Sequence, residues 1–433
     1  MKKGIRVVLI IVAVVVALAV CGLAAFKRWF DPHRGVERGY VISEQIDKSL
    51  TVSEAKEDIE YAMKKLRERH PAWLEKENSK VDAVEAKYEE EMAALKTDGG
   101  NLTVLEEWQI ISRIFALLED GHTNADMHPE QFRFIEDYSQ IKEYGLPTAI
   151  NGEPIEDVLS RFYQLKNCET KEYLIEKFTS QVLFYEIYLR WVGVDTSNGV
   201  TYTFETQDGP VDYHYNLVSY REVKGYGGGD KEWVSYSFDE AADLGIFVLR
   251  ECNNNDKYKA TVKEFFETVN DKGIKNIALD LRGNGGGNST VANEFMSYLG
   301  ASSVKGLRCH IRYGNLLLKF DNPKYRINHK EPTFEGNIYV LTNTGTFSSA
   351  KDFAMLMRDN GLGMIVGEAA GNRPDSYGDV LNFTTPNSKL AIEISFTRWF
   401  RVDKTKPGDI LSPDYPCESE NALTKVYELI AGD

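Results

Sequence analysis

Twenty consecutive residues near the start of the chain, Val7 to Phe26, carry no charge, and basic residues lie on both sides of them. At the rise of an α-helix, twenty residues span about 30 Å, the thickness of the hydrocarbon layer of a bilayer. The stretch therefore predicts a transmembrane signal anchor over residues 7–26. A short basic N-terminus before a single apolar span usually stays inside the cell. We therefore expect residues 1–6 to be a cytoplasmic tip and the body of the chain to be extracytoplasmic.

Two other interpretations of this stretch remain open. Ala24 and Ala25 are small residues of the kind that precede a signal-peptide cleavage site, although cleaved signals usually have a shorter apolar stretch. Cys21 suggests a lipoprotein, but Val20 stands where such a cleavage site needs a small residue. We therefore expect an uncleaved helix that tethers the protein to a membrane.

The composition excludes several classes of protein. Apolar residues make up 42% of the chain, enough for two or three cores of ordinary domain size. The formal net charge is −15, and the first 26 residues contain no acid, so the remainder is more acidic still. Such a balance argues against nucleic acid or anionic lipid as a partner. The five cysteines show no CxxC spacing, which gives no support to a zinc or redox site.

After the anchor, the character of the sequence changes three times. Residues 27–50 are mixed and polar, as in a linker, and residues 51–125 predict an N-terminal helical region. Three amphipathic stretches predict its helices, at about 53–68, 81–96 and 104–119. Residues 126–240 are rich in aromatic residues and turn signals and predict a β-rich segment. From 241 to 433, strand-like and helix-like stretches alternate, which predicts an α/β core.

A glycine-rich loop follows one predicted strand of that core. The strand, 276–281, leads into Arg282-Gly283-Asn284-Gly285-Gly286-Gly287-Asn288. Consecutive glycines let backbone N–H groups approach a ligand closely, which suits an anion or a developing oxyanion. A dinucleotide-binding loop is the main competitor, but its third glycine would fall at Asn288. A tight turn without a ligand is the simpler alternative.

Ser348 stands at a second junction of this kind, between a predicted strand at 337–342 and a predicted helix at 348–357. A serine at the start of such a helix can point its hydroxyl at a bound carbonyl, and the helix N-terminus favours negative charge nearby. It can equally be an ordinary N-cap. Ser348 and Lys351 also form an S-x-x-K pair, but the Lys-Thr-Gly motif of penicillin-binding enzymes is missing.

His122 differs from the other six histidines because it follows an Asp-Gly turn at the end of an apolar helix. Catalytic groups concentrate in loops, although a surface histidine is the simpler interpretation of this residue alone. The sequence contains no H-E-x-x-H, no G-x-S-x-G and no P-loop motif. Zincins, common α/β-hydrolases and P-loop NTPases are therefore excluded.

Three motifs taken together resemble the C-terminal processing peptidases and the tricorn core protease, the tail-specific serine peptidases. They are Asp120-Gly121-His122-Thr123, the segment Asp280 to Gly287, and Thr346-Phe347-Ser348-Ser349-Ala350. Their order and spacing match, as do His70-Pro71 and Ser412-Pro413-Asp414 at the two ends. The resemblance covers roughly residues 55–420 and implies a crotonase-like α/β catalytic core with Ser348 as nucleophile.

The resemblance also implies roles for other residues. In the processing peptidases a lysine some two dozen residues after the serine is the general base. The corresponding stretch here, Gly367 to Pro374, contains no lysine, and its one basic residue is an arginine, which stays protonated. The chain therefore resembles the tricorn-like branch, in which a histidine is the base, here His122. An acid near the C-terminus completes the charge network in that branch, and we expect Asp403, with Asp409 and Glu393 as alternatives.

The oxyanion is expected between backbone N–H groups of Gly286 or Gly287 and of Ser349, with Asp280 and Arg282 holding the loop in shape. Processing peptidases usually carry a peptide-binding PDZ module, and residues 145–159 resemble only part of one. Neither ligand spacing nor a nucleotide loop points to a metal or an organic cofactor, so we expect none.

The sequence thus predicts a single-pass membrane protein, at a bacterial cell surface, that is a serine-type endopeptidase acting on peptide or protein substrates. Two alternatives stay open: a catalytically inactive ligand- or peptide-binding protein on the same fold, and an esterase or other acyl hydrolase. The sequence does not set the oligomeric state.

Overall fold

The computed structural model describes residues 2–39, 45–75, 78–98, 100–128, 132–224, 232–321 and 323–432. Residue 1 of the expected cytoplasmic tip and residues 40–44 of the expected linker lie outside these ranges.

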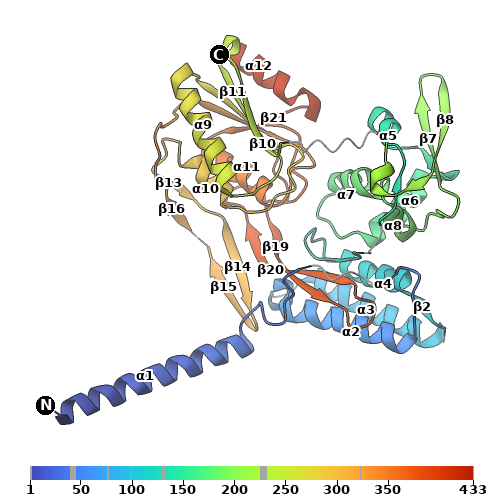
Figure 1. The fold of residues 1–433 in the computed structure, drawn as a ribbon, viewed down its shortest axis with the longest axis horizontal. Helices are drawn as coiled ribbons and strands as arrows, with labels where there is room; N and C mark the ends of the chain where they lie inside the picture. Colours follow the sequence, from blue (N-terminus) through green and yellow to red (C-terminus); the bar gives the residue numbers. More distant parts are fainter. Residues whose placement is uncertain are drawn as a thin grey trace.

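Helix α1 (Lys2–Trp29) extends away from the body of the molecule (Figure 1). Its stretch Ile10–Trp29 is long and apolar enough to cross a membrane, and none of that window is buried. A membrane span and a signal sequence share these properties. The end of the helix contacts the body, where the rings of Phe26 and Tyr313 lie 6.0 Å apart.

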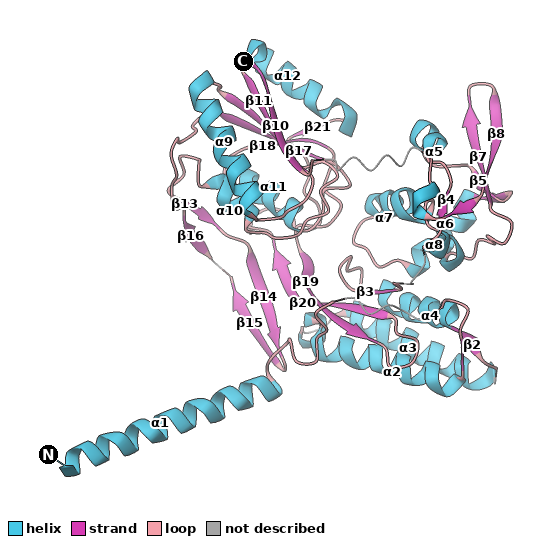
Figure 2. Cartoon of the chain, viewed as in Figure 1, coloured by secondary structure: helices cyan, strands magenta, loops and turns pink. Residues whose placement is uncertain are grey.

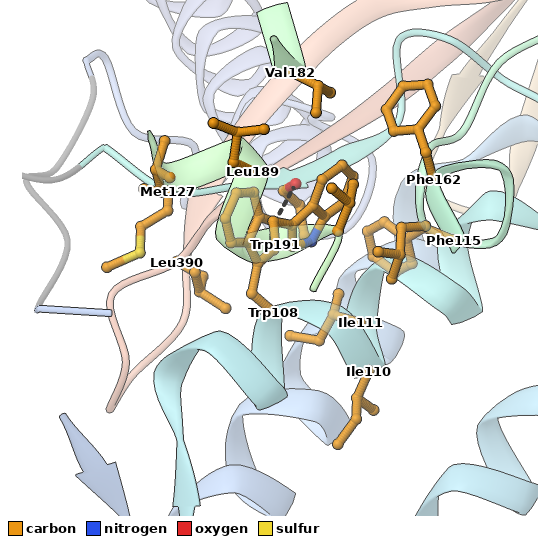
Figure 3. Packing of buried hydrophobic residues seen from close by; sticks show 14 of the residues in the cluster. Trp108, Ile110, Ile111, Phe115, Met127, Phe162, Val182, Leu189, Trp191 and Leu390 are labelled. Atoms are coloured by element: carbon orange, nitrogen blue, oxygen red, sulfur yellow. Dashed lines mark hydrogen bonds between the residues drawn. The ribbon is translucent and has the colours of Figure 1, made fainter. Parts of the chain in front are cut away.

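The three helices expected in the N-terminal region are present: α2 (Val52–Arg69), α3 (Ser79–Asp98) and α4 (Val104–Ala116). Thr51 and Thr103 each form a capping box with the glutamate three residues later, which fixes where α2 and α4 begin. Helix α4 buries Trp108, which stacks on Trp191 at 4.9 Å in the centre of a large apolar core (Figure 3).

The middle segment is not mainly β, as the sequence suggested, but mixed. Its helices are α5 (Ser139–Tyr144), α6 (Ile155–Leu165), α7 (Lys171–Lys177) and α8 (Glu186–Trp191). Its strands are β4 (Phe134–Ile135), β5 (Ala149–Ile150), β6 (Glu153–Pro154), β7 (Val200–Thr206), β8 (Gly209–Tyr215) and β9 (Leu217–Val218). Helix α6 is strongly amphipathic and buries Val158, Leu159 and Phe162 in the core shared with α4. Its apolar residues therefore follow a helical and not an alternating period.

A six-stranded sheet forms the α/β core, in the order β10-β11-β12-β17-β18-β21. Its strands are β10 (Val234–Asp239), β11 (Leu244–Leu249), β12 (Asn276–Asp280), β17 (Asn337–Thr342), β18 (Met364–Gly367) and β21 (Tyr415–Pro416). All neighbouring pairs from β11 onward are parallel, and β10 is antiparallel to β11.

Helices cover both faces of this sheet. Those of the first face share one core: α9 (Asp256–Lys272), α10 (Val291–Met296) and α11 (Ser349–Asp359). The other face packs on α12 (Ala422–Gly432) in a separate core (Figure 2).

A second sheet, in the order β15-β14-β20-β19, joins the α/β core to the N-terminal helices. Its strands are β14 (Arg308–Tyr313), β15 (Leu316–Phe320), β19 (Ser376–Thr384) and β20 (Ala391–Phe400), while β13 (Ser303–Lys305) and β16 (Lys324–Arg326) form a separate pair beside it. The ends of β19 and β20 that lie away from the α/β core pack on α2 and α4. Leu381 and Ile392 belong to the same apolar core as these two helices. There β20 also pairs with β3 (Asn124–Asp126), the strand that directly follows His122. This pairing brings the N-terminal motif to the α/β core.

Candidate active site

Ser348 lies between β17 and α11 and has a backbone conformation that few residues other than glycine adopt, with φ 54° and ψ −126°. A non-glycine residue at positive φ costs free energy and is common where function requires it. Two contacts hold it there. Its backbone N–H donates to Asn372 Oδ1 at 2.9 Å, and Gly286 lies so close that a Cβ added to this glycine would come within 2.7 Å of the Ser348 Cβ.

The imidazole of His122 meets this serine directly. His122 Nε2 lies 2.9 Å from Ser348 Oγ, although the two residues are 226 positions apart in the sequence. The ring packs against Phe347 at a centroid distance of 4.9 Å, and Phe347 in turn stacks on Tyr173 at 4.3 Å. Burial lowers the pKa of His122, although the nearby charge of Asp120 acts in the opposite direction. The imidazole is therefore neutral near pH 7 and able to accept a proton.

Asp120 is the acid closest to the other side of this ring. Its Oδ1 lies 3.8 Å from His122 Nδ1 and accepts a hydrogen bond from the His122 backbone N–H at 2.9 Å. Its Oδ2 accepts hydrogen bonds from Thr123, Ser395 and His70, at 2.5, 2.7 and 3.2 Å respectively. Burial alone would raise the pKa of Asp120, but the hydrogen bond and charge of His70, with the charge of His122, lower it to about 2. Asp120 is therefore an ionised carboxylate that is fixed beside His122.

The structure does not bring Asp403 to this group, contrary to the expectation from the resemblance. The Asp403 carboxylate accepts hydrogen bonds from the backbone N–H and hydroxyl of Thr405, and these bonds lower its pKa. The two alternative acids also lie elsewhere. Glu393 is on β20 opposite Asn124, and Asp409 lines a different cavity. The sequence motif already contained the better placed acid, because Asp120 is the first residue of Asp-Gly-His-Thr.

The expected oxyanion donors are the backbone N–H groups of Gly286, Gly287 and Ser349. The Gly286 N–H already donates a hydrogen bond to Asn284 Oδ1 at 2.9 Å. Across the described ranges, the backbone N–H groups of Gly287 and Ser349 donate no hydrogen bond, and both residues line the cavity at Ser348. Gly287 has φ 130°, and a Cβ there would come within 2.4 Å of the Cys252 carbonyl oxygen, so a side chain is excluded.

Asp280 and Arg282, which we expect to hold the glycine loop in shape, lie at its start and are joined by an ion pair. Asp280 pairs with Arg250 and with Arg282, each at 2.8 Å. Burial would raise its pKa, but the hydrogen bonds from the two arginines lower the pKa of Asp280 to about 2. Arg282 also donates to the Ser419 carbonyl at 2.6 Å and thereby ties the loop to the C-terminal segment.

Sequence reasoning missed Glu169, which lies against the Asp120–His122 turn. A Cβ on Gly121 would come within 2.8 Å of Glu169 Oε2, so only glycine fits between them. Both carboxyl oxygens are buried without a hydrogen-bond partner in the described residues. Burial first, and then the charge of Asp120, raise the pKa of Glu169 to about 8. Nothing in its local sequence distinguishes this residue.

Asp120, His122 and Glu169 could hold a metal ion, because one ligand atom from each lies within 4.8 Å of the others. The oxygens of Asp120 already accept four hydrogen bonds, however. The cluster therefore offers a cation few free lone pairs, and we assign no metal to it.

Ser348 and His122 open into a cavity of about 280 Å³. A larger cavity of about 910 Å³ adjoins it, and both are lined by Ser376 and Tyr377. The smaller space suits one side chain, and the larger suits a further length of peptide.

Comparisons with known proteins bear on the fold and on the family. Residues 243–416 match the model of Peptidase family S41. No curated protein matches the sequence. Mature CPAF, solved in complex with lactacystin, has 13% sequence identity and a TM-score of 0.62, over 88% of this chain and 97% of that one. The photosystem II D1 C-terminal processing protease has 13% identity and a TM-score of 0.50, over 88% and 98% respectively.

These matches confirm the resemblance drawn from the three motifs. At 13% identity the solved structures show the fold, while the family model covers the segment that contains the glycine loop and Ser348. Residues 243–416 of this mixed α/β chain therefore match Peptidase family S41, the family of serine-type peptidases that its motifs resemble.

Proposed function

We propose that this protein is a membrane-anchored serine endopeptidase that hydrolyses peptide bonds through an acyl-enzyme on Ser348, with His122 as general base. The observation that carries the proposal is the 2.9 Å contact between His122 Nε2 and Ser348 Oγ. This distance is short enough for direct proton transfer between the two groups.

In the first half of the reaction, His122 Nε2 removes the hydroxyl proton of Ser348 while Oγ attacks the substrate carbonyl carbon. The carbonyl oxygen becomes negative and accepts hydrogen bonds from the Gly287 and Ser349 N–H groups. The Asp120 carboxylate stabilises the imidazolium that has formed. His122 then gives its proton to the leaving amine, the C–N bond breaks, and the acyl group stays on Ser348.

In the second half, a water molecule replaces the amine. His122 Nε2 takes one proton from the water, and the hydroxide attacks the acyl carbon. The tetrahedral intermediate uses the same two N–H donors. Its collapse breaks the bond to Oγ, and His122 returns the proton to Ser348.

The cellular placement is part of the proposal. The basic N-terminus followed by the apolar window of α1 supports a single-pass anchor with the catalytic core outside the cell. A crotonase-like arrangement of the α/β core is likewise proposed from the three motifs. C-terminal recognition of substrates is not included, because residues 145–159 match only part of a PDZ module.

Labelling with a fluorophosphonate tests the central assignment, because the probe reacts covalently with an activated serine. The full chain in detergent is compared with Ser348→Ala and Ser349→Ala by intact mass. We expect the wild type and Ser349→Ala to gain one probe mass and Ser348→Ala to gain none. A folded wild-type protein that does not react would support the binding-protein alternative. A labelled protein that cleaves esters but no peptide would support an acyl hydrolase.

A further inference from the structure

The cavity at Ser348 is lined by acids and by an indole, and it contains no lysine or arginine side chain among the residues described. Its charged members are Asp352 and Asp379, with Trp399 on another wall. We infer that this cavity binds a lysine or arginine side chain of the substrate, on the residue whose carbonyl Ser348 attacks. The inference rests on the proposed function and adds the substrate class to it.

Geometry places that side chain in this cavity. The two oxyanion donors, Gly287 and Ser349, line the same space as Ser348. A carbonyl held between them therefore belongs to a residue whose side chain starts in this cavity. The volume of about 280 Å³ is of the size that one long side chain fills.

The negative charge of the cavity is only partly neutralised. Lys351 Nζ pairs with Asp352 Oδ1 at 2.6 Å, but Lys351 is buried behind the wall and does not line the cavity. Among the described residues, no lysine or arginine forms an ion pair with Asp379, although the charges of His122 and His33 act on it. Desolvation raises the pKa of Asp379 and the charge of Asp352 acts in the same direction, while a hydrogen bond from Thr397 lowers it. A bound cation would offset the negative charges of both acids.

Trp399 gives the cavity a second feature that favours a cation. A lysine or arginine within about 6 Å of an indole face is attracted by the ring quadrupole. Gly378 separates Trp399 from His122, since a Cβ on Gly378 would come within 3.3 Å of the indole and 3.9 Å of His122 Cε1. The absence of a side chain at 378 thus keeps the space beside the indole open to the substrate.

The wall of β19 departs from regular strand geometry at the acid. Gly378 and Val380 pair with Thr397 and Ser395 of β20, whereas Asp379 between them forms no ladder pair and has φ 57°. Asparagine and glycine tolerate this conformation. Asp379→Asn and Asp379→Gly can therefore remove the charge without straining the backbone, and they form the matched variants for a test.

The test compares aminocoumarin peptides that differ only in the residue before the scissile bond. Arginine is compared with citrulline, its neutral isostere, and lysine with leucine, on the full chain in detergent. Active sites are first counted with the fluorophosphonate probe. We expect kcat/KM for arginine to exceed that for citrulline by about tenfold or more. In Asp379→Asn and Asp379→Gly this ratio should fall to about one.

The control variant is Asp212→Asn, which removes an exposed acid on β8 and should keep the wild-type ratio. Equal rates for arginine and citrulline, or a preference for leucine, in a protein that reacts with the probe would overturn the cation assignment alone. A protein that does not react with the probe would instead count against the proposed catalytic function.

Discussion

His122 Nε2 and Ser348 Oγ lie 2.9 Å apart because β3, which follows the histidine, pairs with β20, which follows the serine. The catalytic contact therefore depends on an antiparallel pairing between segments more than 260 positions apart. Replacement of His122 by alanine should lower kcat/KM by about a thousandfold or more, because Ser348 loses its proton acceptor. The thermal midpoint should change little, and His214→Ala on β8 serves as the control. Retained turnover would reject His122 as the base.

The pH dependence of the reaction should reflect the burial of His122. Because burial lowers its pKa from the ordinary value of 6.5, the imidazole stays neutral to a lower pH than an exposed histidine. We expect kcat/KM to be constant around pH 7 and to fall as the pH drops through that lowered pKa. An acid limb centred at 6.5 or above would contradict this environment for the ring.

Asp120→Asn should affect both activity and stability. The folded pKa of Asp120 is about 2 against an ordinary 3.8, so the ionised carboxylate contributes stability above pH 3.8 that is lost as the pH falls through 2. The shift corresponds to roughly 2 kcal/mol. The amide nitrogen of asparagine is a donor and cannot accept a hydrogen bond, so asparagine cannot replace both carboxylate oxygens of Asp120. Denaturant unfolding at pH 7 should show the loss, with kcat reduced by about a hundredfold or more. Asp403→Asn, in contrast, should leave the rate unchanged.

The sequence was sufficient for the local parts of this site. Strand, loop and helix around Gly286 and Ser348 each follow from hydrophobic period and glycine content, which are short-range signals. The N-terminal helices were also predictable, since capping boxes at Thr51 and Thr103 accompany a clear helical period. Helix α6 could have been recognised from the same period, but the aromatic residues around it favoured a β interpretation.

The sequence was not sufficient for what depends on long-range pairing. The sheet of β14, β15, β19 and β20 joins strands that lie far apart in the sequence. No local sequence pattern indicates that β20 pairs with β3. The family pattern predicts the third acid near the C-terminus, whereas the fold places Asp120 beside the ring. Glu169 was missed because burial of a lone acid is set by packing and not by its neighbours in sequence.

Glu169→Gln should stabilise the protein at alkaline pH. With a folded pKa of about 8 against an ordinary 4.5, the wild-type acid contributes stability that is present below pH 4.5 and lost as the pH rises through 8. Glutamine is the neutral counterpart of the protonated acid and does not ionise. We expect equal thermal midpoints at pH 5 and a midpoint higher by roughly 3 °C or more at pH 9. Glu205→Gln on β7 is the control, and a lower midpoint at pH 9 would mean that Glu169 is held as an anion.

Gly286→Ala tests the close approach of the glycine loop to the nucleophile. An added Cβ would come within 2.7 Å of the Ser348 Cβ and 2.9 Å of the Phe347 carbonyl, and the φ of 99° disfavours any side chain. The loop must therefore move away from Ser348, which displaces the neighbouring Gly287 N–H from the oxyanion position. We expect the rate of fluorophosphonate labelling to fall by about a hundredfold or more. Gly285→Ala is the matched control, because no atom lies within 4 Å of its added Cβ, and it should label at the wild-type rate. Equal labelling rates for the two variants would show that the approach of Gly286 to Ser348 is not needed for catalysis.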